Sequence, residues 1–157
     1  MAETSITPGV LSDWALDVGA YTDGTAPTSY LPVRGITEFT PPVPEKNLED
    51  DGDFDGGAWG SQVATGISYK IEGTVKTPRG GRPADPGQAI LAAAGSGVLE
   101  EGFVHFRCYN KRSGVGHEGI ADATFADNGG PKTDLTTAAF TLTGRGALEP
   151  YTKTVTP

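Results

Sequence analysis

Alternating apolar and polar residues along the chain predict a mainly β protein. The clearest run is residues 67–76, where Ile67, Tyr69, Ile71 and Val75 share one face and polar residues fall on the other. Further runs of this kind predict strands at residues 14–18, 31–39, 103–110, 119–125 and 137–147, with a bulge at Gly35. Strands at this spacing are typical of a β-sandwich or a barrel.

One segment, residues 86–94, predicts a short α-helix. Asp85 stands at the N-cap position, Pro86 at the first helical position and Gln88 where a capping box would place it. Gly95 is typical of the residue that follows the end of a helix. A helix of about ten residues is marginal alone in water, so we expect it to pack against the sheet.

The whole chain, residues 1–157, is expected to form a single domain, because a domain ordinarily holds roughly 100–200 residues. Three segments have no strand or helix pattern: an N-terminal arm (1–13), a long loop between strands (40–61) and a C-terminal tail (148–157). The long loop begins near Pro41-Pro42-Val43-Pro44, whose prolines cannot donate backbone hydrogen bonds and therefore end the sheet.

Charge changes this picture by separating one segment from the rest. The chain has 20 acidic and 12 basic residues, a formal charge of −8. A surface of that sign repels phosphate, which argues against a conventional DNA or RNA binder. The excess is local, since residues 45–55 hold six acids against Lys46, a balance of −5 that leaves −8 + 5 = −3 for the remainder.

The sequence favours neither a membrane protein nor a secreted one. No stretch approaches 18 apolar residues, and the first residues are polar, so we expect no membrane span and no secretory signal. The single cysteine, Cys108, cannot form an internal disulfide, and nothing favours an oxidising compartment.

No residue pattern predicts an enzyme or a cofactor. Residues 114–119 match G-x-G-x-x-G, but the residues that follow alternate like a strand, whereas a dinucleotide-binding fingerprint must open a helix. We therefore expect a glycine-rich hairpin with His117 at its tip. Cys108 and His105 lie three residues apart in a predicted strand, so they point to opposite faces and cannot pair as nucleophile and base.

The best candidate for a metal site is the segment Asp51-Gly52-Asp53-Phe54-Asp55-Gly56. Asp51, Asp53 and Asp55 occupy the first, third and fifth positions of a calcium loop, where carboxylates converge on one cation. The twelfth position is Gln62 instead of a bidentate Glu, and no helices flank the loop. A solvated acidic loop is the alternative, and it is the one we favour.

Taken in order, these segments resemble the major tail tube proteins of long-tailed (siphovirus-type) bacteriophages. The stretches that carry the resemblance are Trp14–Val18, Val33–Glu38, an acidic Asp/Gly loop closing in Gly57–Ser61, Gly66–Thr74, a small helix in mid-chain, and Phe140–Gly146. The resemblance implies a β-sandwich or barrel-like fold with one helix, close to that of type VI secretion tube proteins.

The resemblance also implies a structural role in the virion. Family members form rings, expected to be hexameric, that stack into a hollow tail tube through which double-stranded DNA leaves without specific binding. Their partners are copies of themselves and other tail proteins, such as the tape measure, tail tip and terminator proteins. The resemblance implies assembly in the bacterial host cytoplasm, with no catalysis, cofactor or membrane.

The charge pattern leads to a hypothesis about how such rings would meet. The acidic loop of one subunit would contact a basic turn, Lys76–Arg82 or Arg107–Arg112, on the next. Each exposed ion pair contributes only about 0–1 kcal/mol, so apolar side chains in the loop should supply most of the affinity. The candidate contact residues are Glu49, Asp50, Asp51, Asp53, Phe54, Asp55 and Trp59 in the loop, and Lys76, Arg79, Arg82, Arg107, Lys111 and Arg112 in the basic turns.

Two other functions fit the same residues. A calcium-dependent β-sandwich binding module would use Asp51, Asp53 and Asp55, with Trp59 as a platform on which a sugar stacks. Another virion component, such as a capsid decoration protein or a tail terminator, shares the composition but should form closed assemblies instead of tubes.

Overall fold

The computed structural model describes residues 5–22, 25–80 and 85–154. Its strands are β1 (Trp14–Ala20), β2 (Leu31–Pro32), β3 (Ile36–Thr40), β4 (Glu45–Asp50), β5 (Gln62–Ser68), β6 (Lys70–Lys76), β7 (Phe103–Asn110), β8 (Val115–Asp127) and β9 (Thr137–Thr152). Its helix is α1 (Pro86–Gly95), and short 3₁₀ turns lie at Leu11–Asp13, Phe54–Gly56 and Leu99–Gly102. The chain is mainly β with one α-helix, as the sequence predicts.

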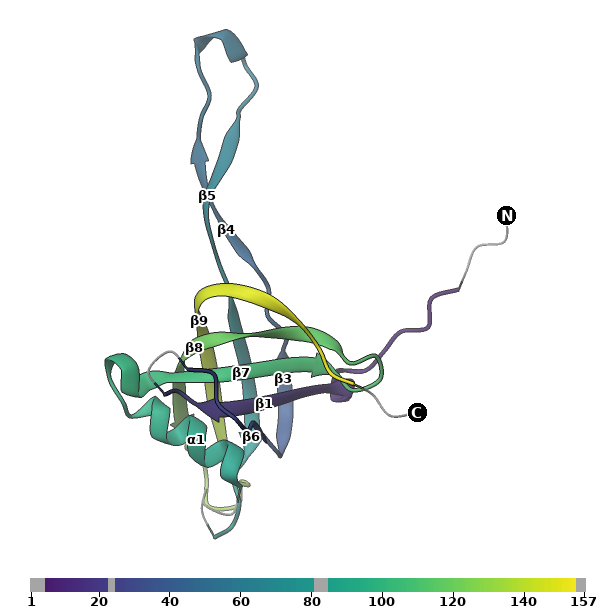
Figure 1. The fold of residues 1–157 in the computed structure, drawn as a ribbon, viewed down its shortest axis with the longest axis vertical. Coiled ribbons are helices and arrows are strands. Elements are labelled where there is room, and N and C mark those ends of the chain that lie inside the picture. The colour runs from purple at the N-terminus through teal and green to yellow at the C-terminus, as the bar shows by residue number, and fades with distance from the viewer. Residues whose placement is uncertain (1–4, 23–24, 81–84, 155–157) are drawn as a thin grey trace.

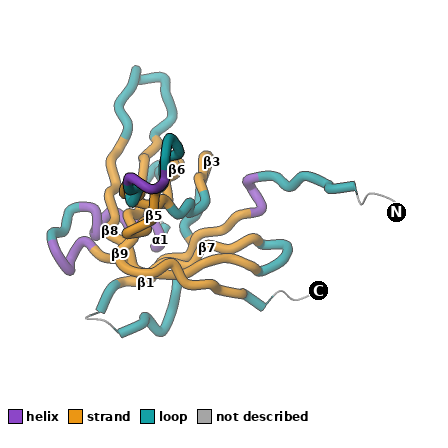
Figure 2. The backbone as a smooth tube through the Cα atoms, turned by 90° about the horizontal axis from the view of Figure 1, so that it is seen from above, coloured by secondary structure: helices purple, strands orange, loops and turns teal. Residues whose placement is uncertain are grey.

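Seven strands form one antiparallel sheet in the order β2-β1-β7-β8-β9-β6-β3, and the sheet curls into a half-barrel (Figures 1 and 2). Because side chains alternate along each strand, one face of the sheet lines the concave side. The buried residues on this face include Leu16, Val18, Ile71, Val75, Val104, Phe106, Cys108, Phe140 and Leu142. The barrel-like form of the predicted fold is thus the one observed.

Helix α1 lies against β8 and β1 and completes the core with the buried Leu91. The boundaries agree with the prediction, but two of the expected cap roles are wrong. Gly95 is the last residue of α1 and Ser96 is the C-cap. A β-carbon on Gly95 would stand 2.9 Å from the Phe125 nitrogen, so this glycine allows the helix to approach β8 closely.

The predicted capping box is also wrong, because its side chains bind other segments. Gln88 is buried, and its Nε2 donates to the carbonyl oxygens of Arg34 and Lys76, both at 2.8 Å. The buried Asp85 carboxylate accepts from the Arg34 backbone nitrogen at 3.1 Å. These contacts tie the start of α1 to the chain around Gly35, which has φ +79° and separates β2 from β3. The bulge itself falls just after it, between Ile36 and Glu38.

The prediction of a long loop at residues 40–61 is wrong, because most of this segment belongs to a β-hairpin. Strands β4 and β5 pair only with each other and project from the sheet (Figure 1). Every residue of both strands is exposed, so the polar sequence of β4 gave no burial pattern to recognise. The predicted strand 67–76 is accordingly two strands that part at Tyr69, whose side chain stays buried while Ile67 joins the hairpin and is exposed.

The predicted C-terminal tail begins too early. Strand β9 continues to Thr152 and pairs with the first half of β8, as in Gly116 with Tyr151. The Tyr151 ring packs against Tyr109 and beside the Arg107 guanidinium, so aromatic and cationic contacts hold this strand. At the other end, residues 5–10 form the extended arm that the sequence predicts, and the 3₁₀ turn follows. In the described ranges no helix is both long and apolar enough to cross a bilayer.

Replacement of Gln88 tests the role of its side chain in joining α1 to the sheet. We expect Gln88→Ala to lower the free energy of unfolding by about 1–3 kcal/mol, because the buried side chain and its two hydrogen bonds to the Arg34 and Lys76 carbonyls are lost. Gln62→Ala, at an exposed position of β5, should change it by less than about 0.5 kcal/mol. Urea unfolding followed by tryptophan fluorescence measures both, and equal effects would contradict this role.

Candidate assembly interface

The acidic segment predicted from the sequence lies at the far end of the β4–β5 hairpin. Residues 49–61, here called the acidic tip, carry the carboxylates of Glu49, Asp50, Asp51, Asp53 and Asp55 and no cation. At about 3.3 Å of rise per residue, the four residues of β4 that precede the acidic tip hold it about 13 Å from the body. At such a distance the repulsion between these carboxylates and the acids of the body is largely screened, and the exposed tip is open to a partner.

Two of the aspartates shape the acidic tip through local hydrogen bonds. Asp53 Oδ1 accepts from the backbone nitrogens of Asp55 and Gly56, each at 3.1 Å, and Asp50 Oδ1 accepts from Gly52 nitrogen at 2.8 Å. These are the local turns that Asp side chains favour. In the described part of the chain no three acidic, His or Cys side chains gather to hold a metal ion, so Asp51, Asp53 and Asp55 do not converge as a calcium loop requires.

The acidic tip exposes two large aromatic side chains to water. Phe54 has a relative exposure of 106% and Trp59 one of 88%. The hairpin below them adds Leu48, Val63 and Ile67, which are also exposed. A two-stranded ribbon is at best marginally stable by itself, and an exposed apolar group ringed by charge is typical of a binding surface. The hairpin therefore has the composition of a surface that another molecule covers.

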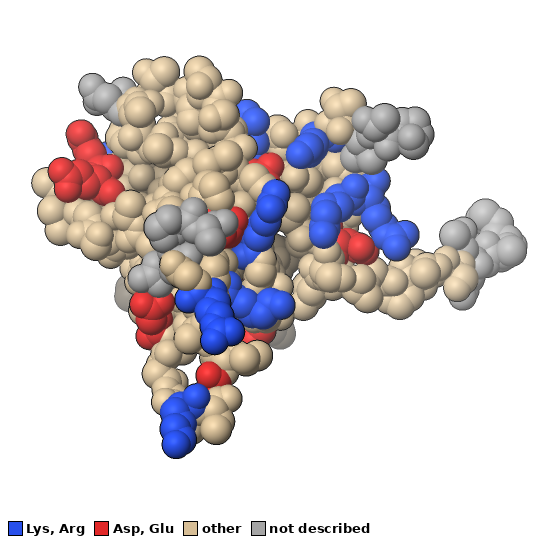
Figure 3. Space-filling model, turned by 90° about the horizontal axis from the view of Figure 1, so that it is seen from below, with Lys and Arg blue, Asp and Glu red and all other residues tan. Residues whose placement is uncertain are grey.

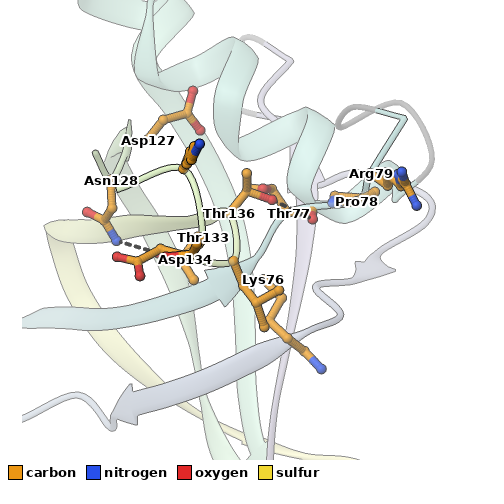
Figure 4. Close-up of a pocket in the computed structure, with 12 residues that line it drawn as sticks. Lys76, Thr77, Pro78, Arg79, Asp127, Asn128, Thr133, Asp134 and Thr136 are labelled. Atoms are coloured by element: carbon orange, nitrogen blue, oxygen red, sulfur yellow. Dashed lines mark hydrogen bonds between the residues drawn. The ribbon is translucent and has the colours of Figure 1, made fainter. Parts of the chain in front are cut away.

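The opposite end of the molecule carries a broad hollow beside the turn that follows β6 (Figure 4). This basal hollow, of about 1070 Å³, is lined by residues 76–79, 127–128 and 132–137. Its cations are Lys76, Arg79 and Lys132, against the carboxylates of Asp127 and Asp134. Figure 4 shows the Lys76 and Arg79 side chains extending outward from its rim. The acidic tip and the basal hollow thus lie at opposite ends of the long axis (Figure 1).

Three other basic residues named from the sequence, Arg107, Lys111 and Arg112, are not at this end. Arg107 lies on β7, with its Nε 3.0 Å from Glu118 Oε2 and its guanidinium between the rings of Tyr30 and Tyr151. Arg107 is therefore engaged within the subunit. Lys111 and Arg112 lie in the turn between β7 and β8, at the side of the body. Arg82 lies outside the described residues.

Sequence reasoning missed two residues of the basal hollow. Lys132 and the exposed Leu135 come from the loop between β8 and β9, which pairing of β6 with β9 brings beside Lys76. The only local signal was the turn sequence Asp127–Pro131. A basic residue just after a turn has no special meaning until the topology places that turn at one end of the molecule.

The structure separates Cys108 from His105, as predicted, but it places His117 directly opposite Cys108 on the neighbouring strand β8. Cys108 is fully buried on the concave face, whereas His105 lies on the opposite face of β7 and stacks on Tyr21. Burial raises the pKa of the Cys108 thiol to about 12 and lowers the pKa of the His105 imidazole. The glycine-rich segment 114–119 enters β8 and begins no helix, so the hairpin interpretation is confirmed. The expected place of His117 at the tip is wrong, because His117 lies within β8 and pairs with Cys108.

Comparisons with known proteins find similarity only at the level of the fold. No protein-family model matches the sequence, and no curated protein matches it. The SPP1 tail tube structure aligns with a TM-score of 0.67 at 13% identity, covering 93% of this chain and 80% of that one. The tail of an empty GTA particle with C6 symmetry gives 0.64 at 14% identity, covering 93% and 100%.

A third solved structure, the virion of a native gene transfer agent (GTA) particle, gives a TM-score of 0.58 at 11% identity, with 91% and 98% of the two chains covered. All three similar structures are of tails or of a complete particle. At these identities the likeness establishes the fold of the chain, which is that of tail tube proteins.

The Cys108 thiol should be inert in the folded protein. At pH 8 we expect a thiol reagent to label native protein at least about 100-fold more slowly than protein unfolded in urea, because burial excludes the reagent and suppresses the thiolate. Absorbance of the released thiol chromophore measures both rates. Rapid labelling of the native protein would place Cys108 in a reachable site and reopen the question of a nucleophile.

Proposed function

We propose that this chain is a structural subunit of a virion tail tube, and that its copies polymerise along the tube axis by inserting the acidic tip of one into the basal hollow of the next. The position of these two surfaces at opposite ends of the long axis carries the proposal. Such a contact joins two different surfaces and leaves both free at the ends, so it generates an open filament instead of a closed dimer.

Apolar burial and charge have separate roles in this contact. The exposed ion pairs contribute only about 0–1 kcal/mol each, so burial of Phe54 and Trp59 supplies most of the affinity. The charges of Asp51 and Asp55 against Arg79 and Lys132 set the register and speed the encounter. The exposed Leu135 in the basal hollow gives these aromatic rings an apolar partner.

The fold supports a ring as the repeating unit, because a structure with the same fold has C6 symmetry. A ring of six copies would carry a formal charge of 6 × −8 = −48, which opposes the binding of DNA phosphates. We infer that stacked hexameric rings form the conduit for genome ejection in the virion tail and that they assemble in the bacterial host cytoplasm. Tape measure, tail tip and terminator proteins are the expected partners, and the role requires no catalysis.

Exchange of the charges tests the axial contact. Purified wild-type protein at high concentration should form tubes in negative-stain electron microscopy, whereas Arg79→Glu/Lys132→Glu and Asp51→Lys/Asp55→Lys should each prevent them. The chain carrying all four substitutions should form tubes again, because the two surfaces are once more complementary. Asp53 is left in place since it holds the turn. Closed rings alone from the wild type would favour a decoration or terminator protein.

Removal of the aromatic anchors tests the apolar part of the contact. Phe54→Ala/Trp59→Ala should raise the protein concentration needed for tube formation at least about tenfold, since hot-spot truncations cost at least about 2 kcal/mol. The melting temperature of the monomer should stay within about 2 °C, because both side chains are exposed. Light scattering measured against protein concentration gives the threshold concentration for tube formation. An unchanged threshold would show that the Phe54 and Trp59 side chains do not bind the next subunit.

A further inference from the structure

The turn between α1 and β7 holds two apolar side chains in water. Val98 and Leu99 have relative exposures of 76% and 83%. Leu99 has φ +52° and is the one non-glycine residue with a left-handed backbone in the described ranges. A residue with a β-carbon adopts this conformation only at an energetic cost. The fold thus maintains a strained backbone at the point where it exposes an apolar side chain.

This turn is rigid and acidic. The Glu101 nitrogen donates to the Val98 carbonyl at 3.2 Å, and Gly97 and Gly102 pack closely against neighbouring atoms. Glu100 and Glu101 are exposed, and neither forms an ion pair with any described residue. A hollow of about 500 Å³ is lined by residues 98–101, the Phe103 ring and Arg145. The Arg145 guanidinium lies 4.4 Å above the Phe103 ring.

The other end of β7 has the opposite charge. The strand runs for eight residues, about 26 Å, from the α1–β7 turn to the β7–β8 turn, where Lys111, Arg112 and Val115 are exposed. Arg112 pairs with Asp13 at 3.3 Å but keeps 83% of its side chain exposed. Figure 3 shows acidic side chains gathered at the left of the molecule, where Figure 1 places the α1–β7 turn, and Lys and Arg side chains toward the right.

We propose that these two ends of β7 bind each other between neighbouring copies of the chain, side by side around a ring. The α1–β7 turn (Val98, Leu99, Glu100, Glu101) of one copy binds the β7–β8 turn (Lys111, Arg112, Val115) of the next. This inference rests on the proposed function, because it presumes self-assembly, and it identifies the lateral partner that the axial contact does not supply.

Three features support the pairing. The charges are complementary, with two carboxylates facing two cations. The Val115 side chain is exposed by 59% and is small enough to enter the hollow beside Leu99 and Phe103. The two surfaces lie at opposite ends of one strand across the long axis, so the contact is head-to-tail and does not use the acidic tip. Such a contact closes into a ring when each copy is rotated from the last by a fixed fraction of a turn, as in the C6 assembly of similar fold.

Charge exchange at these ends tests the lateral contact. Glu100→Lys/Glu101→Lys and Lys111→Glu/Arg112→Glu should each abolish rings in electron microscopy and leave only monomers or single-file filaments joined by the axial contact. The chain with all four substitutions should regain rings. An equimolar mixture of the two double variants should also form rings. One variant has two basic turns and the other has two acidic turns, so alternating copies present opposite charges at every contact. Glu38→Lys/Glu72→Lys, with the same change in net charge as Glu100→Lys/Glu101→Lys, is the control for that variant and should assemble like the wild type.

A second variant tests Leu99 itself. Leu99→Gly removes the backbone strain and the exposed side chain together. We expect the melting temperature of the monomer to stay constant or rise while the concentration needed for ring formation increases at least fivefold. A merely structural role for Leu99 would instead lower the melting temperature and leave assembly unchanged.

The outcomes separate the two proposals. Wild-type protein that stays monomeric at every concentration overturns the proposed function. Wild-type tubes together with normal tubes from Glu100→Lys/Glu101→Lys overturn the lateral contact alone. Single rings that do not stack in Arg79→Glu/Lys132→Glu, and no rings in Lys111→Glu/Arg112→Glu, are the pair of results that the two contacts require.

Discussion

The packing of α1 into the curled sheet is the interaction on which the rest of the molecule depends. Leu91 completes a core built from β1, β6, β7, β8 and β9, and Gln88 and Asp85 fasten the start of the helix to the turn around Gly35. The subunit therefore satisfies its main apolar burial internally. The β4–β5 hairpin, the α1–β7 turn and the β7–β8 turn contribute little to that core, so their exposed apolar and charged residues are free to bind other molecules.

The sequence predicted the elements whose burial pattern is local and missed those held by other means. Strand β7 begins and ends as predicted because Val104, Phe106 and Cys108 line one face while His105 and Tyr109 are buried on the other. Strand β4 has no buried residue at all and is held by pairing with β5, which no hydrophobic pattern reveals. The break at Tyr69 also gives no signal in the sequence. The alternation of Ile67, Tyr69 and Ile71 continues across it, although the chain passes there from one sheet to the other.

The same distinction applies to the surfaces. Composition located the acidic tip and its aromatic residues, because a run of carboxylates with Phe54 and Trp59 is visible in one stretch of sequence. The basal hollow combines segments that only the topology brings together, such as Lys132 beside Lys76. Leu99 gave no sequence signal, since nothing local shows that its backbone is left-handed. Whether a charge is available also depends on tertiary contacts, as the pairing of Arg107 with Glu118 shows.

Charge is separated along two directions in this subunit, with the acidic tip opposite the basal hollow and the two turns of β7 opposite each other. A reconstruction of the assembled protein by cryo-electron microscopy tests this account most directly. We expect density for residues 49–61 to enter the neighbouring subunit between Arg79 and Lys132. Density that leaves this hairpin in solvent, or that shows only unassociated subunits at high concentration, would contradict it.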